Sequence, residues 1–478
     1  MREHAGALGM LVAPGARGHC GSFRPLDLSP SPHTCARFVR RRGFAQNARR
    51  LAVWRKHWVE LASGQRRLKT SRVRHAFRAS SALALAALLV GCGGTDPASA
   101  GDDGESFTPR PITDTPGARR FVVLAEPGEV PGVADQPTER GRSIATLAPF
   151  GSHLYLGYGD FSDNTGPITD VSYDVERARF EAGEPLETEE VLDFQLHAGQ
   201  LFIAELDPRG HEALGSVFRR GPGSSEKWHA MPDIPEAVHS FGMAEFGGEL
   251  FVGTGSVEGG TARLAVTSDA GETWRDAHST ASPPGVFTRY THLGTTSSEL
   301  FVSGRIHGEP SAPFAYIWNG ERWDAVSDLP SDGFLIPLVL DDQFFILQFS
   351  GDRGKGGHEL GSYRITSPPA TDSEPSRALV TQAPLLAEET CVNWSQAPVT
   401  DRTPTPPRTW VLTERSDGTQ SVYLAESATD WQLVGELPSL PDADSFTSIA
   451  YLDDAVYLGT AHGGLCALEE IFELANGA

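Results

Sequence analysis

Short runs of apolar residues return at a nearly constant interval from residue 119 to the end of the chain. Seven of them share one feature, an aromatic residue at the third position: HLYLGYG, QLFIAEL, ELFVGTG, ELFVSGR, QFFILQF, RTWVLTE and AVYLGTA. The aromatics are Tyr155, Phe202, Phe251, Phe301, Phe345, Trp410 and Tyr457, at intervals of 47, 49, 50, 44, 65 and 47 residues. Runs of this length and composition predict buried β-strands, one in each of seven repeated units.

Each unit holds further strand-like runs separated by glycine-rich turns. In the third unit they begin near His239, Leu250, Arg263 and Trp274. Four short strands per period are typical of a β-propeller blade. We therefore expect an all-β fold, a single β-propeller over residues 119–478 with seven four-stranded blades.

The last unit has only three strands and ends at GGLCALEEIF. An unfinished blade would expose a sheet edge. The run RRFVVLAE, residues 119–126, precedes the first unit and is predicted to supply the missing strand. The one long interval contains SPPATDSEPSR and TDRTPTPPR, which predict a loop insertion at about 351–407.

Five units close with an aromatic residue in the fourth strand. We expect these side chains to pack between neighbouring blades rather than to contact a ligand. They are Phe180, Trp228, Trp274, Trp323 and Trp431.

An apolar segment at Ala79–Val90 follows three arginines and ends at Gly91 and Cys92. Twelve residues are too few to cross a bilayer, and the basic flank is typical of a secretion signal. Leu89-Val90-Gly91-Cys92 resembles the lipobox of bacterial lipoproteins. The resemblance implies that residues 72–91 are a signal peptide, that Cys92 is lipidated, and that residues 92–118, which are poor in large apolar side chains, form a disordered tether.

Charge divides the chain at the same place. Residues 1–91 carry a net charge of +14 and the remainder −36, with Lys227 and Lys355 as the only lysines after Cys92. We expect residues 1–71 not to belong to the real protein, because of a start codon placed too early, with Val73 as a natural start. The acidic remainder excludes nucleic acid as a partner. Export permits a disulfide between Cys391 and Cys466.

The third unit contains TSDAGETW, residues 267–274, which resembles the Asp-box of BNR-repeat propellers, a group that includes sialidases. The resemblance implies a structural turn between the third and fourth strands. In that turn Asp269 accepts backbone N–H groups, Gly271 takes a positive φ, and Trp274 packs beneath. The matching positions are Thr267, Asp269, Gly271, Thr273 and Trp274.

The first two units carry GDFSDNTGP and DPR, which resemble motifs of secreted bacterial propellers of undefined function. Loops that follow the second and fourth strands of propeller blades open on one face, and polar groups that converge there make the default ligand site. We expect such a site, for a small polar or glycan ligand, from these loops and from two residues beside the central channel. Its candidates are Asp160, Asn164, Asp207, Arg209, His239, Arg289 and Arg305.

Three functions are open to such a chain. The first is a lipid-anchored binding or scaffold module of the cell envelope, at the outer membrane, monomeric and contacting a glycan or an envelope protein. The second is a sialidase-like hydrolase, in which Arg209, Arg289, Arg305 and Tyr290 could serve. The third is a scaffold for outer-membrane assembly. No catalytic motif, cofactor motif or calcium loop is present in the sequence, so we expect neither a cofactor nor a metal.

Overall fold

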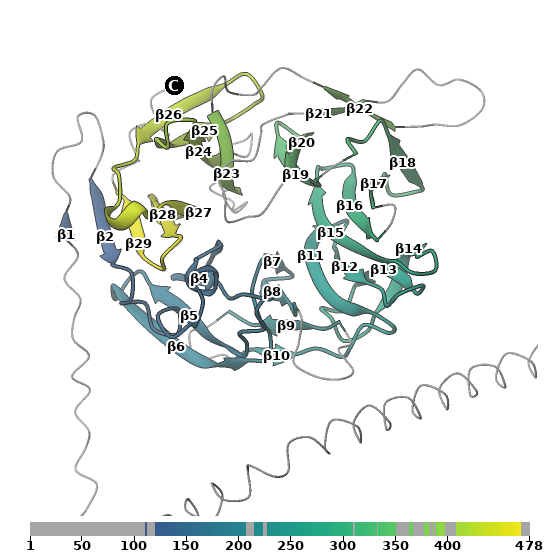
Figure 1. Ribbon diagram of the computed structural model, residues 1–478, viewed down its shortest axis with the longest axis horizontal. Coiled ribbons are helices and arrows are strands. Elements are labelled where there is room, and N and C mark those ends of the chain that lie inside the picture. Colours follow the sequence, from purple (N-terminus) through teal and green to yellow (C-terminus); the bar gives the residue numbers. More distant parts are fainter. Residues whose placement is uncertain are drawn as a thin grey trace, which may run out of the picture. The chain divides into compact units, whose positions relative to one another are not determined.

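The chain folds into a ring of antiparallel sheets, as expected for a β-propeller (Figure 1). The computed structural model describes residues 110–111, 120–206, 215–222, 227–308, 311–331, 333–349, 363–366, 377–381, 386, 389–396 and 408–469. Within these residues the strand pairings form seven successive groups of four. The predicted all-β propeller is therefore confirmed.

Blades 1 to 3 follow one another along the chain. Blade 1 contains β3 (Thr146–Phe150), β4 (His153–Gly157), β5 (Ile168–Asp174) and β6 (Arg179–Leu186). Blade 2 contains β7 (Phe194–His197), β8 (Gln200–Ala204), β9 (Val217–Arg220) and β10 (His229–Ala230). Blade 3 contains β11 (Val238–Phe246), β12 (Glu249–Gly255), β13 (Thr261–Thr267) and β14 (Arg275–Ala281).

Blades 4 to 6 repeat the order. Their strands are β15 (Phe287–Thr295), β16 (Leu300–His307), β17 (Ala312–Trp318) and β18 (Trp323–Ser327); β19 (Phe334–Leu340), β20 (Gln343–Phe349), β21 (Tyr363–Thr366) and β22 (Arg377–Thr381); β23 (Glu389–Gln396), β24 (Thr409–Arg415), β25 (Gln420–Ala425) and β26 (Trp431–Glu436). A short parallel pairing of β18 with β22 and a single residue pair between β12 and β15 join blades 3 to 5.

Blade 7 is built from both ends of the described chain. It contains β27 (Phe446–Leu452), β28 (Ala455–Thr460), β29 (Leu465–Leu468) and β2 (Phe121–Ala125). Strand β2 pairs antiparallel with β29, placing Phe121 opposite Leu468 and Val122 opposite Ala467. The predicted closing strand is therefore confirmed. Outside it, β1 (Arg110–Pro111) pairs with β2, so two residues of the expected disordered tether are paired.

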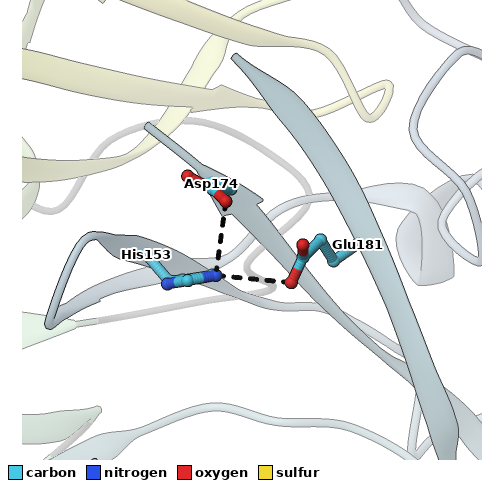
Figure 2. A group of neighbouring side chains, drawn as sticks. All are labelled: His153, Asp174 and Glu181. Carbon is cyan, nitrogen blue, oxygen red and sulfur yellow. Dashed lines mark hydrogen bonds and ion pairs between the residues drawn. The ribbon is translucent and has the colours of Figure 1, made fainter. Parts of the chain in front are cut away.

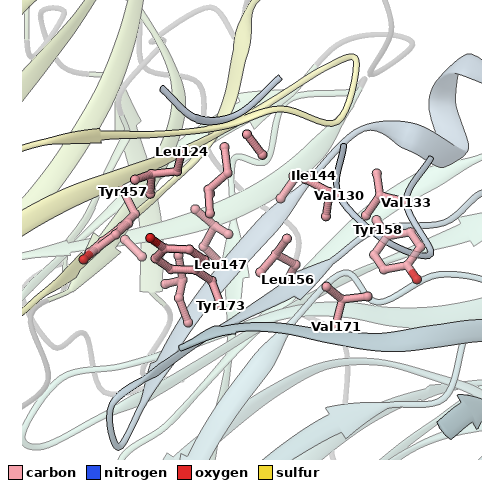
Figure 3. Packing of buried hydrophobic residues seen from close by; sticks show 14 of the residues in the cluster. Leu124, Val130, Val133, Ile144, Leu147, Leu156, Tyr158, Val171, Tyr173 and Tyr457 are labelled. Atoms are coloured by element: carbon pink, nitrogen blue, oxygen red, sulfur yellow. The ribbon is translucent and has the colours of Figure 1, made fainter. Parts of the chain in front are cut away.

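The hydrophobic core lies between consecutive blades. One cluster joins blades 7 and 1 and includes Leu124 of the closing strand and Tyr457 of β28 (Figure 3). Further clusters join blades 1 and 2, 2 and 3, 3 and 4, 4 and 5, 5 and 6, and 6 and 7. Each blade is thus packed on both sides, and the repeated aromatics of the second strands are all buried in these layers.

The fourth-strand aromatics lie at the rims of the same layers. Trp323 packs against the cluster of blades 3 and 4, and its indole N–H donates to the carbonyl of Ala277 in β14, 3.1 Å away. Phe180, Trp228, Trp274 and Trp431 are likewise half-buried against core clusters. Their contacts are those expected of packing residues.

Two expectations are corrected. The segment 351–407 is not a loop insertion alone, because it contains β21, β22 and β23. The disulfide is absent: Cys391 and Cys466 are both free and buried, the first in the layer of blades 5 and 6 and the second in that of blades 6 and 7. Burial raises the pKa of the Cys466 thiol to about 12.

Helix is scarce in the described part of the chain. It comprises α3 (Glu139–Arg142) and the 3₁₀ turn η1 (Pro441–Ala443). No helix in this part is long and apolar enough to span a membrane.

Removing the closing strand should destabilise the ring. A chain that begins at residue 127 loses Val122 and Leu124, which are 0% and 5% exposed, and leaves β29 as an open edge. Burial of one such side chain typically contributes about 1.5–3 kcal/mol. We expect a lower melting temperature and aggregation on size-exclusion chromatography.

The matched control is a chain that begins at residue 119, which loses β1 but retains β2. It should melt like the full chain. If the chain beginning at residue 127 is also monomeric and melts unchanged, β2 does not close the ring.

Candidate functional site

The loops after the second and fourth strands open on one face of the ring, called here the loop face. The largest loop of blade 1 on this face, residues 158–167, connects β4 to β5. Asp160 in this loop is 1% exposed. Its carboxylate accepts hydrogen bonds from Thr138 Oγ1 at 2.9 Å and from Ser162 Oγ at 2.5 Å. Asp160 therefore holds the loop from inside, which argues against a direct ligand contact.

Arg140 of α3 joins this loop to the next one along the ring. Its guanidinium lies 3.6 Å from Asp160 Oδ1, 3.4 Å from Glu190 Oε2 and 4.6 Å from the centre of the Phe161 ring. Burial alone would raise the pKa of Asp160, but the hydrogen bonds from Ser162 and Thr138 and the charge of Arg140 lower it. The carboxylate is ionised at neutral pH and stays paired.

Gly159 is required for this junction. Its φ is +120°, and it pairs with Glu190 in an isolated bridge. A Cβ at this position would lie 2.2 Å from the carbonyl oxygen of Glu189, so only glycine permits the close approach. The first glycine of the GDFSDNTGP motif is therefore required by the structure of this junction. Asn164 of the same motif is exposed and has a φ of +54°.

A second group of side chains lies at the loop-face ends of blades 3, 4 and 5. Arg289 of β15 places its guanidinium 4.8 Å from the ring centre of Phe287 and 5.3 Å from that of Phe241 in β11. Phe287 stacks on His307 of β16, with ring centres 4.9 Å apart and an interplanar angle of 8°. These residues, with Arg305, His239 and Phe334, form what we call the arginine–aromatic cluster.

Arg305 stands directly opposite Arg289 in the antiparallel pair of β15 and β16. Like charges at such positions destabilise a sheet. Arg305 donates to the carbonyl of Gly333 at 2.6 Å and to Ser311 Oγ at 2.8 Å, neither of which carries a charge. The cluster therefore concentrates positive charge at one place on an acidic protein.

His307 is neutral between these two arginines. Burial and the charges of Arg289 and Arg305 lower its pKa to about 4. Its Nε2 is buried and has no hydrogen-bond partner among the described residues. His239, at a φ of +58°, contacts Phe241 edge to face with ring centres 6.2 Å apart. The predicted residues His239, Arg289 and Arg305 thus belong to one group, whereas Asp160 and Asn164 belong to blade 1.

The TSDAGETW segment forms a tight turn between β13 and β14. Asp269 accepts the backbone N–H of Thr273 at 2.9 Å and the Thr273 hydroxyl at 2.6 Å, while Thr267 Oγ1 accepts the N–H of Gly271. Gly271 has a φ of +91°, and the Trp274 indole donates to the carbonyl of Pro232. Hydrogen bonds from Thr273 and Thr267 lower the pKa of Asp269 to about 2. All of these groups are engaged within the fold.

Tyr290, the tyrosine considered for hydrolysis, points away from the arginine–aromatic cluster. It follows Arg289 on the same strand, so the two side chains face opposite sides of the sheet. Its ring is fully buried, and its hydroxyl lies 2.7 Å from both His278 Nδ1 and Thr280 Oγ1. Burial raises its pKa. This surrounding does not suit a nucleophile.

Three carboxylates gather at the loop-face end of blade 2. Burial, together with the nearby charges of Asp233 and Glu187, raises the pKa of Glu205 to about 7. No sequence motif indicates this group, because its members come from three different loops.

Blade 1 holds another titratable group, at the opposite face of the ring. His153 begins β4, Asp174 ends β5 and Glu181 lies in β6 (Figure 2). His153 Nε2 is 3.3 Å from Glu181 Oε2 and 3.9 Å from Asp174 Oδ2. Burial would raise the pKa of Asp174, but hydrogen bonds from Arg177 lower it.

Several predicted positions lie outside the described residues. They are Cys92, Asp207 and Arg209, together with the expected segments 1–71 and 72–91. Residues that sequence reasoning missed include Arg140, Glu190 and Phe287. Only the aromatic spacing at the starts of the first strands could have indicated Phe287.

Comparisons with known proteins give fold likenesses at low identity. No protein-family model and no curated protein matches the chain. Virginiamycin B lyase from Staphylococcus aureus has a TM-score of 0.40 and 12% identity, covering 70% of this chain and 97% of that chain. BamB from Moraxella catarrhalis has a TM-score of 0.34 and 9% identity, covering 68% and 83%. A mutant Aleuria aurantia lectin in complex with a fucosylated sugar has a TM-score of 0.33 and 12% identity, covering 62% and 96%.

Scores this low carry no argument about what the chain binds. The assignment to the β-propeller class rests on the strand pairing and the layered core.

The raised pKa of Glu205 makes stability depend on pH. The folded state keeps a proton up to about pH 7 that a glutamate in the unfolded chain loses near pH 4.5. Stability therefore falls as the pH rises from about 4.5 to 7. Relative to the wild type, Glu205→Gln should melt at a higher temperature at pH 8 and show a much smaller difference at pH 5.

Glu258→Gln, at an exposed glutamate of blade 3, serves as the control and should show no such pH dependence. A Glu205→Gln variant whose melting temperature differs from the wild type by the same amount at both pH values would contradict the assignment.

Proposed function

We propose that this chain is a lipid-anchored β-propeller of the bacterial cell envelope, a binding module whose arginine–aromatic cluster takes an acidic glycan. The observation that carries the proposal is the pair Arg289 and Arg305, placed opposite each other beside aromatic rings at the loop face. An anionic ligand would offset the repulsion between the two guanidinium groups.

The chemistry of the cluster fits a sugar acid. A guanidinium group can hold a carboxylate through two parallel hydrogen bonds. The rings of Phe241, Phe287 and Phe334 offer apolar faces against which a sugar ring can pack. The neutral imidazole of His307 has an unpaired Nε2, among the described residues, that a sugar hydroxyl could satisfy.

Binding is favoured over hydrolysis by the surroundings of Tyr290. Its hydroxyl is buried and hydrogen-bonded on the other side of β15 from Arg289, so the hydrolase alternative lacks its nucleophile there. Asp160 and Glu190, two acids of the loop face at blade 1, are buried and paired with Arg140.

A glycan array tests the ligand. The full chain should bind glycans that carry uronic or sialic acids and not their neutral counterparts. Arg289→Ala and Arg305→Ala should each weaken that binding by about tenfold or more, because a hydrogen bond to a charged group is worth about 1.5–3 kcal/mol. Arg305→Lys, which keeps the charge but loses the fork, should also weaken it.

Arg275→Ala is the matched control. Arg275 is an exposed arginine paired with Glu249, at the opposite face of blade 3. This variant should bind like the wild type. Equal binding of acidic glycans by all four variants, or preference for neutral ones, would overturn the proposed ligand; capture of an envelope protein alone would point to a scaffold.

The anchor is tested separately. Cys92→Ser should move the protein from the membrane fraction to the soluble fraction of its bacterial host, because stable attachment requires more than one acyl chain. Gly93→Ala, at the neighbouring position, should stay with the membrane. A wild-type chain found in the soluble fraction would contradict the anchor.

A further inference from the structure

His153, Asp174 and Glu181 bring three potential metal-ligand atoms together across three adjacent strands of blade 1 (Figure 2). His153 and Asp174 are directly opposite each other in the pairing of β4 with β5. The ligand atoms of all three residues lie within 4.8 Å of one another, and His153 Nε2 is 3.3 Å from Glu181 Oε2.

These separations suit a small divalent ion. A tetrahedral Zn²⁺ with bonds of about 2.0–2.2 Å sets its ligand atoms roughly 3.3–3.6 Å apart. Small side-chain rotations would bring Asp174 Oδ2, now 3.9 Å from His153 Nε2, into that range. One imidazole and two carboxylates are ligands that Zn²⁺ accepts.

Neighbouring groups orient each of the three side chains, as outer-shell partners do at metal sites. Ser152 Oγ lies 3.4 Å from His153 Nδ1. Arg179 donates to Glu181 Oε1 at 2.7 Å, which leaves Oε2 directed at the imidazole. The backbone N–H of Arg177 donates to Asp174 Oδ1 at 3.1 Å, and its guanidinium donates to Oδ2 at 2.5 Å.

The two arginines limit the positive charge that the group can accept. Their side chains are 57% and 55% exposed, so water screens their charges, and the Arg177 guanidinium would turn outward from Asp174 Oδ2 when the ion binds. The histidine and the aspartate are 7% and 0% exposed and are shielded from solvent, whereas Glu181, at 26%, leaves one side of the group open to water.

Comparison among blades sets this group apart from ordinary ion pairs. His153 is the first residue of the repeated second-strand run, a position held by Glu249 in blade 3, Glu299 in blade 4 and Arg408 in blade 6. In those blades the residue pairs with a residue of opposite charge, Arg275, Arg377 and Glu426 respectively. Blade 1 instead places an imidazole between two carboxylates.

We propose that His153, Asp174 and Glu181 bind a divalent transition-metal ion of the Zn²⁺ type, with water completing its coordination. The ion would join β4, β5 and β6 at the face opposite the loops and would stiffen blade 1. We expected no metal from the sequence, because the loop around Asp160 lacks the calcium-loop pattern and no HExxH or CxxC motif is present.

The test is a titration of the full chain, purified without a histidine tag and freed of metal with a chelator. Isothermal titration with Zn²⁺ should show one saturable site, and bound Zn²⁺ should raise the melting temperature. Both His153→Ala and Glu181→Gln should lower the affinity at least about tenfold and abolish the thermal shift. Glu181→Gln keeps the size of a half-exposed side chain, so it guards against a folding defect in His153→Ala.

His197→Ala is the matched control. His197 is a buried histidine of blade 2 that lies 2.9 Å from a single carboxylate, that of Glu245. This variant should keep one Zn²⁺ site of wild-type affinity. No saturable binding by the wild type, or binding unchanged in both His153→Ala and Glu181→Gln, would show that the group is an ion-pair network and not a metal site.

Discussion

The pairing of β2 with β29 is the interaction on which the ring depends. It places residues 121–125 against residues 465–468 and so joins the two ends of the described chain within one sheet. Without it, blade 7 would have an unpaired edge, and the core layer between blades 7 and 1 would lose Val122 and Leu124. Every other layer is formed by neighbours in sequence, so this one non-local pairing converts a row of blades into a closed ring.

The two faces of the ring also differ in the connections that they carry. The turns between first and second strands are short, so the opposite face carries compact hairpins such as the one that begins β4 at His153. The loop face receives the longer connections, and these need internal support. Asp160, Glu190 and Arg140 provide it in blade 1 by burying charges that pair with one another. Buried pairs of this kind fix loop positions and contribute little net stability.

The arginine–aromatic cluster is a different use of charge. Arg289 and Arg305 lie opposite each other in a strand pair and repel each other. Burial and their two charges lower the pKa of His307 to about 4, which keeps the imidazole neutral. In blade 1 Arg140 has the carboxylates of Asp160 and Glu190 beside it, whereas Arg305 donates to a carbonyl and a hydroxyl. A positively charged surface kept on an acidic protein is more readily explained by an anionic ligand than by folding.

The sequence by itself determined the propeller, its seven repeats and its closing strand. Apolar runs with an aromatic such as Phe251 or Phe301 recur because each blade must bury the same kind of layer. That requirement appears in the residues of a single strand, so the sequence pattern reveals it. The turn at Asp269 and Gly271 is equally local, since the hydrogen bonds that Asp269 and Thr267 accept in it come from within one segment of eight residues.

Only the tertiary structure decided which polar residues meet. Arg289, Arg305 and His239 were predicted within one site that also held Asp160 and Asn164, but their assembly with Phe241 and His307 depends on the register between blades. Asp160 was predicted as a ligand contact and is buried instead, because its partner Arg140 comes from a helix that no repeat indicated. His153, Asp174 and Glu181 are neighbours through cross-strand pairing, which sequence spacing does not reveal. The packing positions recur in every blade, so they can be predicted from the sequence. A site forms from residues at which the blades differ, so it cannot.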